Sequence, residues 1–319
     1  MKTIITIGSG YSGSSAVYQY LRSSNFFFDP FPDKEFSLTY DPGGIMDIEN
    51  CLINNFSPNK TNFIYQRFLN NIKFYTNPSS GLKPGKNLQI KKNNLKKILN
   101  NYIESIVNLT YEGESSYIKH NNSKITNLYK KILFKFKKKI KGEMVLFCEL
   151  GEFEKKTYKF FKDLFSINNE EKKDVIIDQA GNIWSPFSST KYFENPKLII
   201  TFRDPRDIFS EFRGKAAFSY PGKDVRKFCR WYENIMLKMN KNEYNNSNIL
   251  KINFEDFVFN NKFVVEKISD HLQIDINPSQ VKFNLLKSQK NVSRYKDNLK
   301  ENEINIIEKD LKEYLHNNK

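Results

Sequence analysis

The feature that most constrains this chain is a run of glycines and serines directly behind its first apolar segment. Residues 3–7 (TIITI) are all β-branched and predict a short strand, and residues 8–15 (GSGYSGSS) form a Gly/Ser loop behind it. Residues 16–21 predict the start of a helix. Glycine permits tight turns, and the free N–H groups of a helix N-terminus attract anions. The sequence therefore predicts a cradle for an anion, most often a phosphate.

The spacing of the Gly/Ser loop leaves several interpretations open. Gly8, Gly10 and Gly13 fit the G-x-G-x-x-G fingerprint of dinucleotide-binding folds. The same loop fits the frame of the nucleoside triphosphate loop, but Ser14 stands where that loop carries lysine, which argues against ATP or GTP hydrolysis. A third interpretation is a serine-rich loop for a sulfated nucleotide. A plain turn without a ligand is disfavoured, because three glycines and four serines cluster at one strand end.

Further apolar runs alternate with amphipathic stretches along the chain. Strands are predicted at residues 26–28, 174–178, 197–202 and 248–252, and helices between them, among others at 225–241, 261–272 and 301–315. This alternation indicates a parallel α/β sheet. In such sheets, ligands bind at the carboxyl ends of the strands. The Gly/Ser loop, Asp178 and Arg203 all fall at such ends.

The length of the chain limits the number of domains, and its net charge limits the class of binding partner. A chain of 319 residues with 39% hydrophobic residues can form one large domain or two small ones. We predict a single domain over residues 1–319, with a helical, Lys/Asn-rich insertion at about 47–142 that includes a basic amphipathic stretch at 124–141. The net charge of +15 suits polyanions or anionic membranes, although a solvated lysine surface explains it as well.

Cysteine and histidine usage argues against metals and disulfides. Cys51, Cys148 and Cys229 are far apart and show no C-x-x-C spacing, which disfavours a disulfide framework or a zinc site. Three histidines are too few for a multi-histidine metal site, and no metal is predicted. Neither a signal peptide nor an apolar run of 18 residues is found. These observations predict a cytoplasmic protein.

A second anion pocket is predicted at the strand that ends before Arg203. The arginine side chain offers a rigid two-pronged donor for phosphate, and Ser210 follows in the early part of the next helix. An ion-paired helix cap is the structural alternative for the sequence RDPRD at 203–207. Two anion pockets together suit a nucleotide that is phosphorylated at two places.

Taken together, these motifs resemble those of PAPS-dependent sulfotransferases, where PAPS is 3′-phosphoadenosine 5′-phosphosulfate. The Gly/Ser loop is similar to the family's 5′-phosphosulfate loop, and residues 197–210 are similar to its 3′-phosphate motif, a strand followed by R-D-P-x-D and a helix serine. Residues 249–257 and 288–296 are similar to its later E-D motif and C-terminal nucleotide-closing loop. The resemblance implies a P-loop-like, three-layer α/β fold with a central parallel sheet of about five strands. It leaves residues 47–142 uncovered.

The resemblance also implies PAPS as co-substrate, PAP as product and a set of nucleotide-binding residues. These are Gly10, Tyr11, Ser12, Gly13, Ser14, Ser15, Arg203, Ser210, Lys290 and Arg294. The chain departs from the family at Tyr11, where Lys or Arg is usual; the loop serines, backbone N–H groups or Lys34 could take over that role. The spacing from Arg203 to Ser210 is seven, where eight is common in the family, and the C-terminal loop lacks the usual glycines.

Sulfuryl transfer needs a base for the acceptor hydroxyl, and family members resemble one another in taking it from the region after the second strand. Glu35 is our first candidate and Asp41 the second, followed by Asp178 and His120. No metal is expected, because donors already hold the leaving phosphate.

The predicted function is therefore transfer of a sulfuryl group from PAPS to a hydroxyl of a sugar or glycan. An anionic membrane surface is a further expected contact, and nucleic acid is not. Two alternatives stay open. One is an NAD(P)-type oxidoreductase that uses the G-x-G-x-x-G loop, with Asp29 as ribose ligand. The other is a basic polyanion-binding module without chemistry, although no zinc-finger or RNP-type signature supports it.

Overall fold

The computed structural model describes residues 1–32, 34–76, 92–107, 109–113, 128, 132, 142–145, 152–215, 220–240 and 247–316. The chain divides into two compact units. The first comprises Met1–Pro30, Glu171–Thr190 and Glu194–Lys319, and the second comprises Phe31–Glu170 and Lys191–Phe193. The single domain with an insertion at 47–142 stays a prediction. Over the described ranges, no helix is long and apolar enough to cross a membrane.

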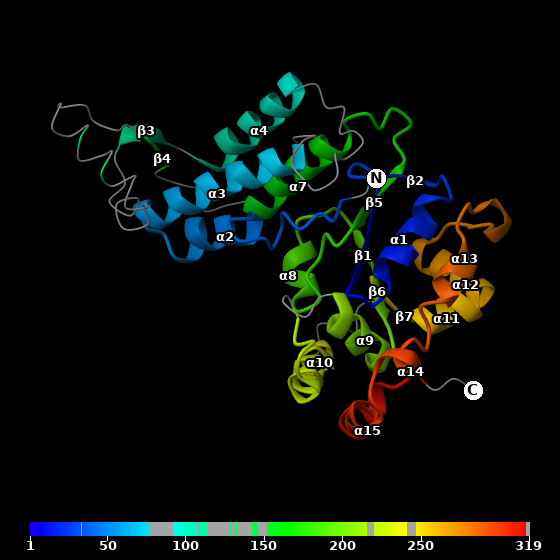
Figure 1. The fold of residues 1–319 in the computed structure, drawn as a ribbon. Coiled ribbons are helices and arrows are strands. Elements are labelled where there is room, and N and C mark those ends of the chain that lie inside the picture. The colour runs from blue at the N-terminus through cyan, green and yellow to red at the C-terminus, as the bar shows by residue number, and fades with distance from the viewer. Residues whose placement is uncertain are drawn as a thin grey trace. The chain divides into compact units, whose positions relative to one another are not determined.

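The first unit is built on a five-stranded parallel sheet (Figure 1). Its strands lie in the order β2 (Phe27–Phe28), β5 (Asp174–Asp178), β1 (Thr3–Gly8), β6 (Pro196–Phe202) and β7 (Ile249–Asn253). β1 pairs with β5 on one side and with β6 on the other, and every pairing in this sheet is parallel. The middle strands are apolar and buried, as strands covered on both faces are. The predicted α/β fold with a central parallel sheet is confirmed.

The strand order distinguishes this sheet from the dinucleotide-binding sheet. In chain order it reads 2-3-1-4-5, so the third strand, β5, lies beside β1, and β2 lies at the edge. The dinucleotide-binding order is 3-2-1-4-5-6, in which the second strand lies beside the first. Asp29, which follows β2, accepts a hydrogen bond from the Tyr18 hydroxyl at 2.5 Å and pairs with Arg22 at 3.0 Å. The carboxylate that an oxidoreductase would use for the ribose is thus engaged with two side chains of helix α1 (Ser14–Arg22).

Helices and short turns of the first unit connect these strands. They are α1 (Ser14–Arg22), α8 (Pro186–Thr190), α9 (Pro205–Lys215), α10 (Val225–Asn240), α11 (Phe254–Phe259), α12 (Asn261–Leu272), η3 (Pro278–Gln280), α13 (Leu285–Gln289), α14 (Tyr295–Asn298), α15 (Glu301–Asp310) and η4 (Lys312–Tyr314). The helices predicted at 225–241 and 261–272 are confirmed. The helix predicted at 301–315 ends at Asp310, and the 3-10 turn η4 follows.

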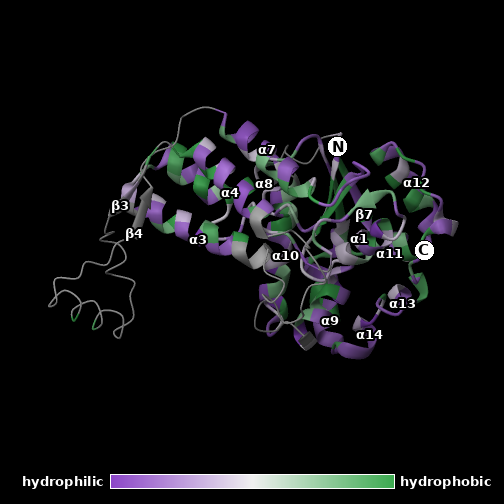
Figure 2. Ribbon diagram, turned by 90° about the horizontal axis from the view of Figure 1, so that it is seen from above, coloured by the Kyte–Doolittle hydropathy of each residue, from purple (hydrophilic) through white to green (hydrophobic). Residues whose placement is uncertain are grey.

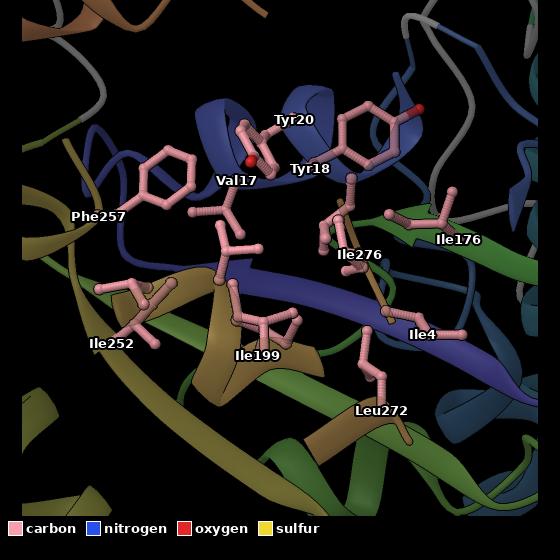
Figure 3. Packing of buried hydrophobic residues seen from close by; sticks show 14 of the residues in the cluster. Ile4, Val17, Tyr18, Tyr20, Ile176, Ile199, Ile252, Phe257, Leu272 and Ile276 are labelled. Carbon is pink, nitrogen blue, oxygen red and sulfur yellow. The ribbon is translucent and has the colours of Figure 1, made fainter. Parts of the chain in front are cut away.

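Helix α1 is fixed to the sheet by an apolar face. Val17 and Tyr20 of α1 lie over Ile4 and Ile199 of the sheet, and all four side chains are at most 2% exposed (Figure 3). Burial of one such side chain contributes about 1.5–3 kcal/mol. Because the last two residues of the Gly/Ser loop, Ser14 and Ser15, are also the first two of α1, this packing holds the end of the loop in place.

The second unit is mainly helical. Its described elements are α2 (Ile45–Glu49), the π-helical η1 (Asn50–Asn54), α3 (Pro58–Thr76), α4 (Lys92–Ile106), β3 (Thr110–Gly113), β4 (Gly142–Val145) and α7 (Phe153–Phe165). Helices α3 and α4 carry hydrophilic and hydrophobic residues side by side (Figure 2). Aromatic rings form much of the core, for example Tyr102 stacked on Phe160 at 4.4 Å. The basic stretch at 124–141, apart from Leu128 and Ile132, lies outside the described residues, as do His120 and Cys148.

Candidate functional site

The backbone of the Gly/Ser loop depends on two of its glycines. Gly13, just before α1, has a φ of +90°, and a Cβ there would lie 2.3 Å from the ring of Phe254. A Cβ on Gly10 would lie 2.5 Å from the phenol ring of Tyr220. Tyr11 also adopts a left-handed conformation, with a φ of 61°. Such a conformation costs a non-glycine residue about 1 kcal/mol or more, so the surrounding contacts must hold this loop in place.

The serines of the loop have different surroundings. Ser14 accepts a hydrogen bond from the Gln179 amide at 2.9 Å, and Ser15 donates one to the Asp178 carboxylate at 3.2 Å. Ser12 is 1% exposed, and its hydroxyl has no hydrogen-bond partner among the described residues. Buried hydroxyls in proteins usually have a partner. Ser12 thus keeps an unused donor within the loop, next to Gly8.

Arg203 joins three segments that are far apart in the sequence. At the end of β6 it is 5% exposed, and its Nη1 donates to the carbonyl of Tyr11 in the Gly/Ser loop at 3.0 Å. Its Nη2 donates to the carbonyl of Asn291 in the C-terminal segment. Its Nε has no partner within the described ranges. Three of the four segments that carry the sequence resemblance thus meet at one guanidinium group.

The residues after Arg203 form a helix cap held by ion pairs. Pro205 is the first residue of α9, a position that suits proline, and the Asp204 carboxylate accepts from the backbone N–H of Arg206 at 2.9 Å. The Arg206 side chain pairs with Asp204 and with Glu308, each at 2.6 Å. The interpretation as an ion-paired helix cap is therefore confirmed for Asp204 and Arg206. Arg203 instead donates to the Gly/Ser loop and to the C-terminal segment.

Asp207 ties α9 to the C-terminal segment. Its carboxylate accepts from the backbone N–H groups of Ser293 at 2.8 Å and Tyr295 at 3.0 Å. Burial raises the pKa of Asp207 above its ordinary value, and the nearby Arg203 guanidinium, 3.9 Å away, acts in the opposite direction. Arg203 therefore has a buried carboxylate as a close neighbour.

The other predicted phosphate ligands are arranged less favourably. Ser210 is buried and accepts from the Asn298 amide at 3.1 Å, while Lys290 is exposed. Arg294 pairs with Glu211 at 2.9 Å. Glu211 is 7% exposed and stands eight residues after Arg203, where sulfotransferases commonly have serine. Our sequence analysis missed this carboxylate, although the shifted spacing pointed to it.

The two first candidates for the base lie in the second unit. Glu35 is exposed as a residue, yet partial desolvation of its carboxyl raises its pKa. Asp41 accepts a hydrogen bond from the Ser37 hydroxyl at 2.7 Å. Asp178, the third candidate, lies in the first unit at the end of β5 and is 6% exposed. The roles of all three stay predictions.

A cavity of about 420 Å³ lies at the carboxyl ends of β6 and β7. Arg203, Asp204, Tyr232, Asn253 and His316 are among its lining residues. Its size is within the range of small-molecule sites. Within the part of the chain that the structure describes, no group of three or more His, Cys, Asp or Glu side chains is placed to hold a metal ion.

When the sequence is compared with protein families, its central part matches one family model. Residues 148–278 match the model of the Sulfotransferase family. The matched range contains β5, β6, the R-D-P motif and β7. The family resemblance drawn from the motifs is thus confirmed. No curated protein matches the sequence.

Several solved structures are similar to the chain at low identity. The sulfotransferase domain from the curacin biosynthetic pathway shares 12% identity over 88% of this chain and 76% of that chain, with a TM-score of 0.38. Sulfotransferase STF1 from Mycobacterium tuberculosis H37Rv shares 9% over 92% and 76%, also with a TM-score of 0.38. Mouse sulfotransferase SULT7A1 complexed with PAP shares 16% over 48% and 70%, with a TM-score of 0.31. At scores this low, the likenesses carry no argument about substrate or mechanism.

Proposed function

From the match of residues 148–278 to the Sulfotransferase family, we propose that this chain transfers a sulfuryl group from PAPS to a hydroxyl group. The observation that carries the proposal is the position of Arg203. Its guanidinium donates both to the Gly/Ser loop and to the C-terminal segment. The segments that resemble the 5′-phosphosulfate loop, the 3′-phosphate motif and the nucleotide-closing loop are therefore next to one another.

Two buried donors support a phosphate-bearing ligand. The Ser12 hydroxyl and the Arg203 Nε are both buried without a partner in the described part of the chain. Phosphate oxygens are acceptors for such donors, and an arginine binds them strongly. In this proposal the Gly/Ser loop holds the 5′-phosphosulfate, and Arg203 and Ser210 hold the 3′-phosphate, with Lys290 and Arg294 as further cations.

The proposed reaction needs electrostatic stabilisation and one base. The bond from sulfur to the 5′-phosphate oxygen breaks while a bond from sulfur to the acceptor oxygen forms, the acceptor's proton goes to a carboxylate, and PAP leaves. Glu35 is the proposed base and Asp41 the second candidate. A raised pKa makes Glu35 a stronger base near neutral pH.

The acceptor and the surface contacts complete the proposed function. We propose a sugar or glycan hydroxyl in the cytoplasm as the acceptor. An anionic membrane surface is the proposed further contact, which the net charge of +15 suits. The acceptor itself follows from family analogy alone.

Calorimetric titration tests the co-substrate. The full chain is titrated with PAP, NADH and ATP in a buffer with Mg²⁺, and selective binding of PAP is expected. The variant Arg203→Lys keeps the charge but loses the two-pronged donor, so PAP should bind at least about tenfold more weakly. Arg230→Ala, on the exposed side of α10, is the matched control and should bind normally. An unchanged affinity in Arg203→Lys contradicts the proposed 3′-phosphate site.

The same titrations address the alternatives. Selective NADH binding would favour the oxidoreductase. Binding of polyanions with a steep salt dependence, and no nucleotide binding, would favour the binding module. Once PAP binding is established, Glu35→Gln should leave it intact and slow the release of PAP from PAPS in the presence of sugar acceptors. A normal rate would assign the base to another residue.

A further inference from the structure

The Gly/Ser loop contains no cationic side chain. Tyr11 stands where sulfotransferases usually have Lys or Arg, and Ser14 stands where nucleoside triphosphate loops have lysine. Both Nη atoms of Arg203 already donate to backbone carbonyls. A reaction that leaves extra negative charge on the 5′-phosphate is faster when a positive group lies there. A positive charge at this loop must therefore come from outside residues 8–15, either from a side chain such as Lys34 or from a bound cation.

A hydroxyl and a carboxylate lie together beside the loop. Thr6 of β1 is the parallel partner of Asp178 at the end of β5, and Ser15 is in the first turn of α1. The Ser15 hydroxyl donates to one Asp178 oxygen at 3.2 Å, and the Thr6 hydroxyl donates to the other at 3.1 Å. Asp178 is 6% exposed. The strand pairing and the packing of α1 thus hold these oxygens at the end of the loop.

This pair has the composition of a magnesium site that depends on phosphate. Mg²⁺ prefers hard oxygen ligands and is usually held by one or two protein groups, with phosphate oxygens and water completing the octahedron. In nucleoside triphosphate loops the protein groups are a Ser or Thr of the loop and an Asp at the end of a strand. Ser15 is in the position of that hydroxyl in the Gly8 to Ser15 frame. Asp178 supplies the carboxylate from the neighbouring strand.

We propose that Ser15 and Asp178 are the protein ligands of a Mg²⁺ site that the 5′-phosphate of the co-substrate completes. The proposal rests on the proposed function and revises the sequence-based expectation of no metal. Two protein oxygens are too few to hold Mg²⁺ tightly without the nucleotide. Metal and nucleotide should therefore bind cooperatively, and each must raise the affinity of the other by the same factor.

Titration of the full chain with PAP, once with Mg²⁺ and once with EDTA, measures this coupling. We expect PAP to bind about tenfold more tightly with Mg²⁺, which is within the usual range of couplings between sites. The reciprocal measurement uses Mn²⁺ as a paramagnetic substitute. The electron paramagnetic resonance signal of free Mn²⁺ should fall when protein and PAP are both present, and much less with either alone.

Two variants test the assigned ligands, and a third serves as control. Asp178→Asn should abolish the effect of Mg²⁺, and without metal it should bind PAP at least as well as the wild type, because a negative charge near the phosphate is gone. Ser15→Ala should weaken the Mg²⁺ effect and is the second test if Asp178→Asn does not fold. Asp174→Asn changes the other end of the same strand, where Asp174 accepts from the Lys2 N–H at 2.6 Å, and should keep the full effect.

The outcomes separate the two proposals. Equal PAP affinity with Mg²⁺ and with EDTA overturns the metal site and leaves the sulfotransferase proposal standing. A Mg²⁺ effect that persists in both Asp178→Asn and Ser15→Ala overturns the assigned ligands. No binding of PAP under either condition overturns the proposed function and the metal site with it.

Discussion

The Gly/Ser loop and the R-D-P region differ in how they prepare for an anion. Residues 8–15 contain no charged side chain, and their donors are backbone N–H groups and serine hydroxyls. Residues 203–213 contain three arginines and three carboxylates. Arg206 and Arg213 each pair with a carboxylate, and Arg294 of the C-terminal segment pairs with Glu211. The Gly/Ser loop would thus bind an anion through its backbone conformation, whereas the R-D-P region would bind it through arginines that are already paired with carboxylates.

This difference determines how each region responds to change. The loop depends on backbone conformations that few side chains permit, so substitution there should disrupt structure and binding together. In the R-D-P region, only the Arg203 Nε is buried without a partner in the described residues, and for other arginine N–H groups a phosphate must replace partners that they already have. Substitution of a neighbouring carboxylate should therefore tune affinity without loss of the fold.

The largest effect is expected for Gly13→Ala. The new Cβ would meet the Phe254 ring at 2.3 Å, in a backbone conformation with a φ of +90° that alanine rarely adopts. Strain and overpacking together should lower the free energy of unfolding by about 2–4 kcal/mol. Urea denaturation measures this loss, and PAP binding should be lost as well.

Gly214→Ala is the matched control for this substitution. Gly214 is in α9, and a Cβ there meets nothing within 4 Å. Alanine in a helix is favoured over glycine by about 1 kcal/mol, so this variant should be as stable as the wild type or more stable. If both variants lost stability alike, the loop would have no special conformational requirement.

A smaller effect, on affinity, is expected for Glu211→Gln. The substitution removes the charged partner of Arg294 and a buried negative charge near the predicted 3′-phosphate site. PAP should bind about fivefold more tightly, which corresponds to roughly 1 kcal/mol of removed repulsion. Glu308→Gln, which changes the partner of Arg206, should leave the calorimetric affinity unchanged. Weaker binding in Glu211→Gln would show that Glu211 positions Arg294 for the ligand.

Local sequence patterns were sufficient to predict two strands of the central sheet and the loop that follows the first of them. The β-branched run before Gly8 and the apolar run before Arg203 predicted strands, because buried parallel strands are almost wholly apolar. The glycine spacing predicted the loop, because few other residues permit its turns. Both conclusions needed only neighbouring residues.

Contacts between distant residues could not be predicted in the same way. No local pattern indicates that β2 lies at the sheet edge, that Asn291 accepts from Arg203, or that Ser15 meets Asp178. The antiparallel pair β3–β4 was missed because its strands are short, and TYEG and GEMV lack a clear alternation. These features follow from tertiary packing, which decides among many locally acceptable pairings.

An effect of similar size, but on stability, is expected for Glu255→Gln. This variant tests whether the R-D-P region and its neighbours carry excess negative charge. Glu255 is 2% exposed; one carboxylate oxygen accepts from the Asp204 N–H at 2.9 Å, and the other has no partner in the described ranges. Burial raises the pKa of Glu255 above the ordinary 4.5. A raised pKa in the folded state means that the native protein binds the proton more tightly than the unfolded chain does. As the pH rises above 4.5, this group therefore lowers the free energy of unfolding.

Glu255→Gln keeps the acceptor and removes the charge. The variant should therefore be more stable than the wild type at pH 7, by about 1 kcal/mol, and the difference should shrink as the pH falls towards 4.5. Urea denaturation at several pH values measures it, with Glu266→Gln on the exposed side of α12 as a control that should show no such trend. A Glu255→Gln variant that is less stable at pH 7 would mean that His316 requires this carboxylate, and that the charges of the R-D-P region are balanced rather than in excess.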